Sequence, residues 1–384
     1  MARMFDTGSP ALSRDDLLDW LRLIRSENVG PVTFRNLLAH YGSARAALEA
    51  LPELSKRGGR KRPVKICSRS RAERELADLE ARGATVLALG SDAYPPALAA
   101  IDDAPPLLFV QGHEVLLQRP GVALVGARNA SANGRRMARE LGAALAADGY
   151  LVISGLARGI DAAAHAGALD GGTAAVMAGG IDVVYPPENE ALYDEIAARG
   201  VLLAEHAPGT EPQARHFPRR NRLISGMARG VVVVEGAQRS GSLISARLAG
   251  EQGREVMAVP GSPLDPRSGG CNSLLKQGAS LVEKPDDVLR VLRDQAAPGP
   301  AEHRDDGFHA TGTGGASPDE VTLDAARREV TELMGSAPVA VDEIMRECQF
   351  SPSIVTMVLL ELELAGRCER HPGNRVALVQ TGPT

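Results

Sequence analysis

Residues 216–248 read HFPRRNRLISGMARGVVVVEGAQRSGSLISARL and place several side chains that can bind an anion within a short stretch. The helix predicted over 218–226, which begins at a proline, carries four polar side chains suited to phosphate: Arg219, Arg220, Asn221 and Arg222. A second helix, carrying Arg247, follows a turn of small residues: Ser240, Gly241 and Ser242. The first N–H groups of a helix lack partners, and the helix dipole favours negative charge near them. The stretch therefore predicts a site for a polyanion, most simply a phosphate backbone.

The elements that must position these residues follow an alternating pattern. Between the two helices lies the β-branched run 231–234, which is typical of a strand buried on both faces in a parallel sheet. From residue 84 to residue 293, further short apolar runs alternate with helical patterns. This alternation predicts an extended Rossmann-like, doubly wound and mainly parallel α/β sheet. Ligands of such sheets bind beyond the carboxyl ends of the strands, where we expect the glycine-rich segments 126–129, 154–159, 179–180, 240–242 and 260–262.

The first strand–turn–helix unit lacks the patterns of the common nucleotide sites. Its sequence, VALVGARNASANGRR, has no GxGxxG pattern, and the next strand ends in Ser154 where a dinucleotide-binding domain has an acid. The sequence has no GxxxxGK[ST] pattern either. We predict that Arg128 lies over the start of the helix, which is unfavourable unless an anion lies between them. The turn therefore predicts a phosphate contact by Arg128 and no bound cofactor.

Catalytic and metal-binding patterns are also missing from the sequence. Asp161 and His165 are four residues apart on a predicted helix, without a third ligand or a nucleophile, and we interpret both as structural. The sequence contains no G-x-S-x-G turn and no cysteine pair at metal-ligand spacing. We therefore predict no catalytic residue, no metal site and no enzymatic activity.

The composition restricts a nucleic-acid role to a local patch. The chain has 384 residues and a formal net charge of -5, so binding to phosphates must depend on nearby arginines. Four scattered cysteines predict reduced thiols in a cytoplasmic protein: Cys67, Cys271, Cys348 and Cys368. No apolar leader or membrane-spanning stretch is apparent, so we expect no membrane insertion.

The chain is predicted to contain an N-terminal helical domain, the Rossmann-like domain, a flexible linker and a winged helix: residues 1–80, 81–294, 295–318 and 319–384. The link at 28–32 fits either a helix-hairpin-helix motif or an ordinary helical hairpin. The basic run 56–71 is either a solvated surface or a nucleic-acid contact. The second helix of the winged helix, 351–365, contains no Lys or Arg. Protein interaction or dimerisation therefore suits it at least as well as DNA reading.

Single-stranded nucleic acid requires flat surfaces for bases, and only 3% of the residues are aromatic. Phe217, beside the arginine cluster, is the first candidate and Tyr185 the second. Phe217 could instead pack on its own helix. At least one arginine of the cluster could instead pair with Glu205 or Glu235. Helical spacing predicts Arg219 and Arg222 on one side, with Arg220 turned away.

Taken together, the motifs SGLARGIDAAAH, GGID with YPPEN, HFPRRNRLISG and VVVVEGAQRSGSLISARLAGEQGREVMAVPGS resemble the DNA-processing protein A (DprA or Smf) family. The resemblance implies a non-enzymatic mediator of natural transformation. Such a protein binds and protects incoming single-stranded DNA, loads RecA onto it and works as a homodimer. The residues that the resemblance assigns to the groove are Arg128, Gly155, Arg158, Phe217, Arg219, Asn221 and 240–242, to which the charge pattern adds Arg220, Arg222 and Arg247. Cys271 departs from the family pattern, in which Thr is common.

An alternative function is a nucleotide phosphoribohydrolase, an enzyme of a related α/β fold. That enzyme class needs a PGGxGTxxE-like turn with its catalytic Glu. In this chain the corresponding region offers only Pro260, Gly261, Ser262 and Pro263.

Overall fold

The computed structural model describes residues 12–296, 320–371 and 373–379. The described residues divide into two compact units, of which one contains residues 77–296 and the other combines residues 12–76 with the described part of 320–379. Each unit is described by itself. No helix among the described residues is both long enough and apolar enough to cross a membrane.

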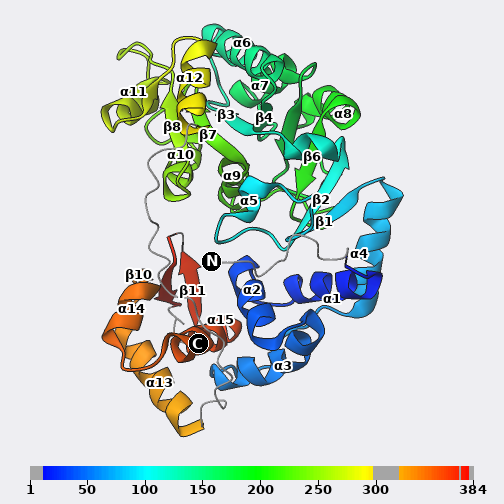
Figure 1. The fold of residues 1–384 in the computed structure, drawn as a ribbon, viewed down its shortest axis with the longest axis vertical. Helices are drawn as coiled ribbons and strands as arrows, with labels where there is room; N and C mark the ends of the chain where they lie inside the picture. Colours follow the sequence, from blue (N-terminus) through cyan, green and yellow to red (C-terminus); the bar gives the residue numbers. More distant parts are fainter. Residues whose placement is uncertain (1–11, 297–319, 372, 380–384) are drawn as a thin grey trace. The chain divides into compact units, whose positions relative to one another are not determined.

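The larger unit is built on a nine-stranded sheet with the order β1-β2-β6-β5-β4-β3-β7-β8-β9 (Figure 1). The strands are β1 Thr85–Ala88, β2 Leu107–Gly112, β3 Gly121–Val125, β4 Leu151–Ser154, β5 Thr173–Val176, β6 Val201–Ala204, β7 Ala228–Val233, β8 Glu255–Ala258 and β9 Ser280–Leu281. β2 is antiparallel to β1 and β6, and all other pairs are parallel. The predicted doubly wound, mainly parallel sheet is therefore confirmed.

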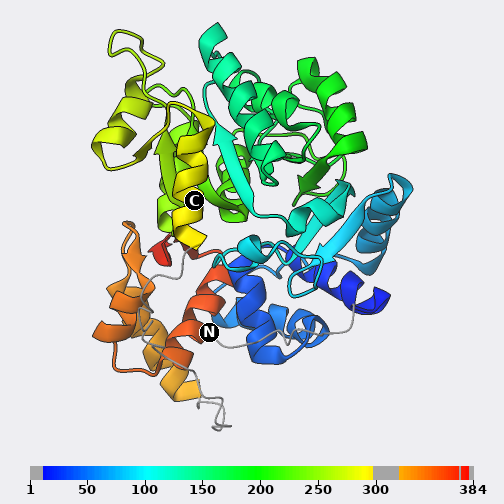
Figure 2. The same cartoon turned by 45° about the horizontal axis from the view of Figure 1, so that its top comes forward.

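Helices cover both faces of this sheet (Figure 1 and Figure 2). One face carries α6 Ala132–Ala147, α7 Ile160–Ala168, α8 Glu190–Arg199 and α12 Pro285–Ala296. The other carries α5 Pro96–Ala99, α9 His216–Met227 and α10 Ser242–Glu251, while α11 Gly269–Lys276 packs on β8. Two short 3-10 turns complete the unit: η1 Glu114–Gln118 and η2 Pro187–Asn189.

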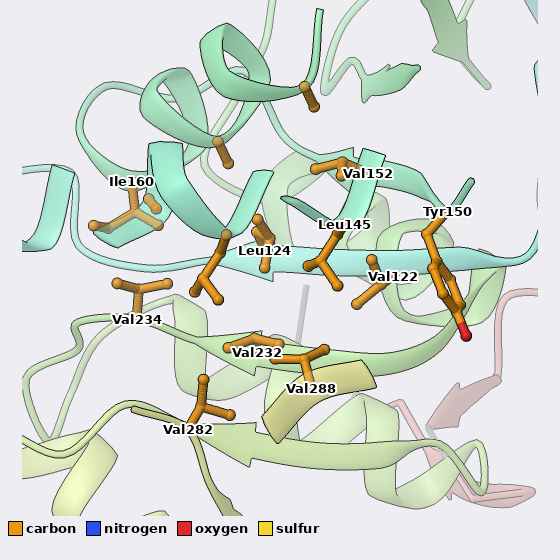
Figure 3. Close-up of a cluster of buried hydrophobic side chains, with 14 of the residues drawn as sticks. Val122, Leu124, Leu145, Tyr150, Val152, Ile160, Val232, Val234, Val282 and Val288 are labelled. Atoms are coloured by element: carbon orange, nitrogen blue, oxygen red, sulfur yellow. The ribbon is translucent and has the colours of Figure 1, made fainter. Parts of the chain in front are cut away.

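The core beneath α6, α7 and α12 follows from strand periodicity. Alternate residues of β3, Val122 and Leu124, point to the same face as Val232 of β7 (Figure 3). They meet Leu145 of α6 and Val288 of α12 in one buried cluster. Because successive side chains of a strand alternate between faces, a run of apolar residues such as β3 fills the cores on both sides of the sheet.

The strand order reverses between β3 and β7. From β3 the chain winds through β4 and β5 to β6 in one direction, and from β7 it winds through β8 to β9 in the other. The loops after these parallel strands all leave from the same edge of the sheet. A ligand site is expected at the reversal, beyond the carboxyl ends of β3 and β7.

The second unit begins with a helical domain: α1 Arg14–Ile24, α2 Pro31–Tyr41, α3 Ala44–Arg57 and α4 Arg69–Ala81. Ser13 caps α1, since its side chain accepts a hydrogen bond from the N–H of Asp16 at 3.2 Å. In the basic run 56–71, Arg60 pairs with Glu27 and Arg69 pairs with Asp15. These pairs fit a solvated surface, whereas nucleic-acid contact by the run is an untested prediction.

The C-terminal part of this unit is the predicted winged helix. It consists of α13 Glu320–Leu333, β10 Val339–Ala340, α14 Val341–Glu347, α15 Pro352–Leu364, β11 Cys368–His371 and β12 Arg375–Leu378, with the strand order β10-β12-β11. The hairpin turn between β11 and β12 contains Gly373 and Asn374, both with positive φ, a conformation that glycine and asparagine tolerate. Most of the predicted linker 295–318 lies outside the described residues.

Candidate nucleic-acid interface

A small pocket lies at the carboxyl edge of β3, β4 and β5, beside the reversal of strand order between β3 and β7. The loops after these strands and the first turn of α9 line it: Arg128, Gly155, Ala157, Arg158, Tyr185, Pro186 and Phe217. The structure thus brings together four residues that the sequence assigned to a nucleic-acid site, together with the second aromatic candidate, Tyr185.

Phe217 is the centre of this arrangement. The guanidinium carbon of Arg128 lies 4.7 Å from the centroid of the Phe217 ring. The ring of Tyr185, which is 44% exposed, lies 5.8 Å from it. A guanidinium over an aromatic face is held there by the ring quadrupole. The pocket therefore combines flat apolar surface with a positive charge at its opening.

The helix that carries Phe217 begins earlier than predicted. We expected a proline-initiated helix over 218–226, whereas α9 runs His216–Met227. Proline is tolerated throughout the first turn because the N–H groups of that turn have no helical partner. Phe217 therefore lies on the helix itself, and the prediction that it precedes the helix is wrong.

The loop after β4 is held from inside by His165. Leu156, whose φ is 54°, donates its N–H to Nε2 of His165 at 3.3 Å. Since Thr173 Oγ1 donates to the carbonyl of Val152, Nδ1 of His165 must donate to that hydroxyl, at 2.7 Å. Burial lowers the pKa of His165 to about 3, so the ring is neutral. The predicted structural role of His165 is confirmed.

Asp161 and Arg220 also support this loop from the buried side. Asp161 accepts a hydrogen bond from the N–H of Ala157 at 3.3 Å, and burial raises the pKa of its carboxyl group although the charge of Arg220 opposes this. Arg220 donates to the carbonyl of Val176 at 2.7 Å. Gly155 packs directly on Arg220, since a Cβ there would lie 1.8 Å from its Nη1. Only glycine fits this position.

This burial corrects two of the predicted contacts. Arg220 is 6% exposed and bonds the carbonyl of Val176, so its side chain supports the loop and is not presented to a ligand; its burial lowers its pKa to about 10. Arg222 is 8% exposed and grips both carboxylate oxygens of Glu205, at 2.6 and 2.7 Å. The alternative that one arginine pairs with Glu205 or Glu235 is therefore confirmed. Helical spacing predicted Arg219 and Arg222 on one side with Arg220 turned away, whereas in the structure Arg220 and Arg222 are both buried and Arg219 is exposed.

At the reversal itself, the protein supplies its own anion. Glu235, just beyond β7, accepts hydrogen bonds from the N–H of Ser131 at 2.9 Å and from the Ser131 hydroxyl. That hydroxyl in turn accepts from the N–H of Gly134 at 2.9 Å, so it caps α6. The carboxylate thus lies at the helix start where a dinucleotide phosphate is usually bound. Arg128, predicted to contact a phosphate there, extends instead over Phe217.

The remaining predicted contacts lie around the start of α10. The side chain of Asn221 is half-buried and donates to the carbonyl of Gly241 at 3.5 Å, which links α9 to this turn. Ser242 is buried and its hydroxyl bonds to that of Ser240 at 2.6 Å, which leaves Gly241 exposed. Arg247 is exposed but pairs with Glu251 one helical turn further along α10, and no hydrogen bond or ion pair within the described chain connects it to the pocket lining.

Two further arginines at this edge were not predicted. Arg215 precedes α9 and Arg239 lies in the loop after β7, and both are exposed. Within the described residues, no carboxylate forms an ion pair with Arg128, Arg215, Arg219 or Arg239. Arg158 differs, since it lies 3.6 Å from Glu188 and both side chains are 60% exposed. An exposed pair of this kind contributes little. Their position beside the cluster HFPRRNR and in a glycine-rich loop is the signal that could have identified Arg215 and Arg239.

The four cysteine thiols are poorly placed to act as nucleophiles. Cys67, Cys271, Cys348 and Cys368 are free and buried. Burial raises the pKa of Cys271 to about 11, so its thiol stays protonated near neutral pH. Among the described residues, no group of three or more His, Cys, Asp or Glu side chains could hold a metal ion.

Comparisons with known proteins agree with this geometry. Residues 85–293 match the DNA recombination-mediator protein A family, 14–77 a DprA-like N-terminal HHH domain and 315–374 a DprA winged-helix domain. The second match favours the helix-hairpin-helix interpretation of the link at 28–32. DNA processing protein DprA of Bacillus subtilis is 43% identical over 58% of this chain and 76% of its own length. Protein Smf of Synechocystis is 31% identical over 93% and 97%.

Two solved structures extend the match. The DprA structure from Streptococcus pneumoniae has a TM-score of 0.59 and 36% identity, covering 71% of this chain and 95% of that one. A structure of DNA processing protein A from Helicobacter pylori, described as giving insight into its single-stranded DNA binding mode, has a TM-score of 0.51 and 28% identity over 55% and 96%. By family match, sequence and fold, the chain belongs to the DNA recombination-mediator protein A family.

Proposed function

We propose that this protein binds single-stranded DNA at the pocket around Phe217, as a non-enzymatic mediator of recombination. The observation that carries the proposal is the cluster in which Arg128 lies over the Phe217 ring and the Tyr185 ring lies beside it, tilted by 56°. It lies at an edge of the sheet where further arginines have no carboxylate partner within the described chain.

The geometry favours single strands over duplex. An aromatic face can stack only a base that has left its own helix, and such stacking contributes about 1–3 kcal/mol per base. Bases differ little in their flat faces, so the pocket is expected to be tolerant of sequence. The arginines contribute the salt-dependent attraction to the backbone. Tyr185, 44% exposed, extends the stacking surface beyond Phe217.

The similar proteins support the same function. The relative from Bacillus subtilis is named for DNA processing, and the Helicobacter pylori structure for a single-stranded DNA binding mode. We extend this to the finer role that the resemblance implies, namely protection of incoming strands in natural transformation, loading of RecA and action as a homodimer. Stimulation of RecA filament assembly on coated single strands tests the loading step.

The phosphoribohydrolase alternative has less support. The helix start at the strand reversal, suited to a nucleotide phosphate, is occupied by Glu235. In the turn at 260–263, Gly261 is held by Asn272 through both its N–H and its carbonyl, and the turn contains no Glu. Release of ribose 5-phosphate from nucleoside monophosphates would support the alternative.

A binding titration tests the proposal. Fluorescence anisotropy of labelled oligo-dT and of a matched duplex is measured at about 50 mM and about 200 mM salt. Four arginines that form no ion pair with a carboxylate among the described residues, Arg128, Arg215, Arg219 and Arg239, predict a slope of about -3 for the logarithm of the binding constant against the logarithm of salt concentration. Equal affinity for single and double strands, or binding that salt does not weaken, would contradict the proposal.

A further inference from the structure

The second helix of the winged helix is buried on more sides than its own domain explains. In α15, every residue of 358–364 is buried. The winged-helix core accounts for only one side of the helix, through Val355, Val358, Leu359 and Leu362. Leu360 and Leu364 lie outside this core, yet both are at most 2% exposed. A second surface must therefore cover the other side of α15.

That surface is the N-terminal helical domain of the same unit, in which α2 and α3 pack against α15. Asn28 donates to the carbonyl of Leu364 at 3.1 Å. Thr33 donates to the carboxylate of Glu363 at 2.8 Å, in a buried contact. In the opposite direction, Arg367 donates to the carbonyl of Gly58 at 3.3 Å. Side chains of both domains thus bond the backbone of the other.

The two backbones also approach closely. Gly58 ends α3, and a Cβ at this position would lie 2.0 Å from the carbonyl oxygen of Glu361. The φ and ψ of Gly58 are -66° and -1°, which any residue adopts easily. The glycine is therefore required by the contact with α15 and not by the conformation of α3.

The charges of α15 also oppose DNA binding. In a helix-turn-helix domain the second helix usually enters the major groove. Here it contains no Lys or Arg, and its carboxylates Glu361 and Glu363 are matched by Arg327 and Arg370 of the winged helix itself. A phosphate approaching this face would meet two carboxylates. The neutral donors of Asn28 and Thr33 suit it better.

We propose that the winged helix is a docking module for the chain's own N-terminal helical domain, bound through the 358–364 half of α15, and that this helix does not read DNA. Docking also covers the hairpin between α1 and α2, because Asn28 and Thr33 flank the Val29-Gly30-Pro31 turn. Neither element is then open to a DNA backbone, and strand binding is left to the pocket around Phe217.

The test uses the full chain with a site-specific protease sequence inserted after residue 308. After cleavage, the C-terminal piece is expected to co-elute with the rest of the chain on size exclusion. Gly58→Ala places a methyl group against the backbone of Glu361. The dissociation constant of the C-terminal piece should rise at least about tenfold, so that less of the piece co-elutes. The matched control is Gly250→Ala in α10, outside the docking surface, since Gly250 is exposed and a Cβ there meets nothing within 4 Å.

Hydrogen exchange on the uncut chain separates undocking from misfolding. In Gly58→Ala, amides of 358–364 should lose at least about tenfold protection while those of α1 keep theirs. Separation of the piece from the cleaved wild-type chain, or full retention in Gly58→Ala, would overturn the proposal. So would docking onto a second copy, seen as a doubled mass that falls on dilution together with the protection of 358–364.

Discussion

Two places at the carboxyl edge of the sheet can hold an anion, and only one of them is filled by a carboxylate of the protein. At the strand reversal, the start of α6 is occupied by Glu235, which accepts two hydrogen bonds from Ser131. In the same loop after β3, Arg128 lies over Phe217 with no carboxylate ion pair among the described residues. The first place is satisfied from within, and the second is open to solvent and to a ligand.

The difference explains how a fold that often binds a single nucleotide can instead bind a nucleic-acid strand. Backbone N–H groups at a helix start fix one phosphate in one position, which suits a nucleotide. Guanidinium groups on exposed side chains can follow a repeating backbone, and aromatic faces accept any base. By filling the fixed site with a carboxylate, the chain leaves strand binding to Arg128, Phe217 and their neighbours.

Removing the aromatic platform is expected to have the largest effect. Phe217→Ala deletes the surface on which both Arg128 and Tyr185 rest, so oligo-dT affinity should fall by about 2–3 kcal/mol, or about 30- to 150-fold. Phe217→Leu keeps apolar packing without a ring and should lose nearly as much. Anisotropy titration measures both. Wild-type affinity in Phe217→Leu would show that Phe217 only packs on its own helix.

Removing the charge is expected to have the next largest effect. Arg128→Ala should weaken oligo-dT binding by about 1–2 kcal/mol and lower the magnitude of the salt slope by about 0.7, with an unchanged melting temperature. Arg229→Ala is the matched control, because Arg229 is exposed near the start of β7, at the opposite edge of the sheet. Equal losses in the two variants would mean that charge acts without regard to position.

The sequence predicted the sheet and its edge well because strand periodicity is a local property. The runs that became β3 and β7, and the glycine-rich loops after them, needed only short-range pattern. The pairing of Arg128 with Phe217 needed a contact between residues far apart in the chain, and family resemblance rather than pattern placed them in one site. The fate of Arg220 and Arg222 could not be predicted in this way. Helical spacing gives the angle between two side chains but not which of them faces the sheet.

Which arginines of α9 are buried depends on partners that lie far away in the sequence. Arg220 bonds the carbonyl of Val176, and Arg222 bonds Glu205. A buried guanidinium needs such partners, since an unpaired charge inside a protein is costly. The sequence offered Glu205 and Glu235 as alternatives for one arginine, and the structure assigns Glu205 to Arg222 and Glu235 to Ser131. The carboxylate that replaces a ligand phosphate has no signature in the sequence that distinguishes it from an ion-pair partner.

Emptying the internally filled site is expected to have a smaller effect on stability and almost none on strand binding. Glu235→Ala removes the carboxylate from the start of α6 and should lower the free energy of unfolding by about 1–1.5 kcal/mol. Inorganic phosphate should then raise the melting temperature of this variant but not of the wild type. Glu140→Ala, on the exposed part of the same helix, is the control. A tenfold loss of oligo-dT affinity in Glu235→Ala would mean that the two places act as one site.

The smallest effect concerns the support of the open site. The pKa of His165 is lowered to about 3 by burial, so the unfolded chain, with a pKa near 6.5, binds the additional proton first as pH falls. The stability that neutral His165 contributes is present above pH 6.5 and is lost below it, by about 0.7 kcal/mol between pH 7 and pH 6. His165→Gln, whose amide oxygen can still accept from Leu156, should lack this part of the dependence. Denaturant titrations of both proteins at the two pH values measure it, and identical pH dependence would show that folding does not lower the pKa of His165. Because the ring fixes the loop that carries Arg158, oligo-dT affinity of the folded wild type should stay constant across the same interval.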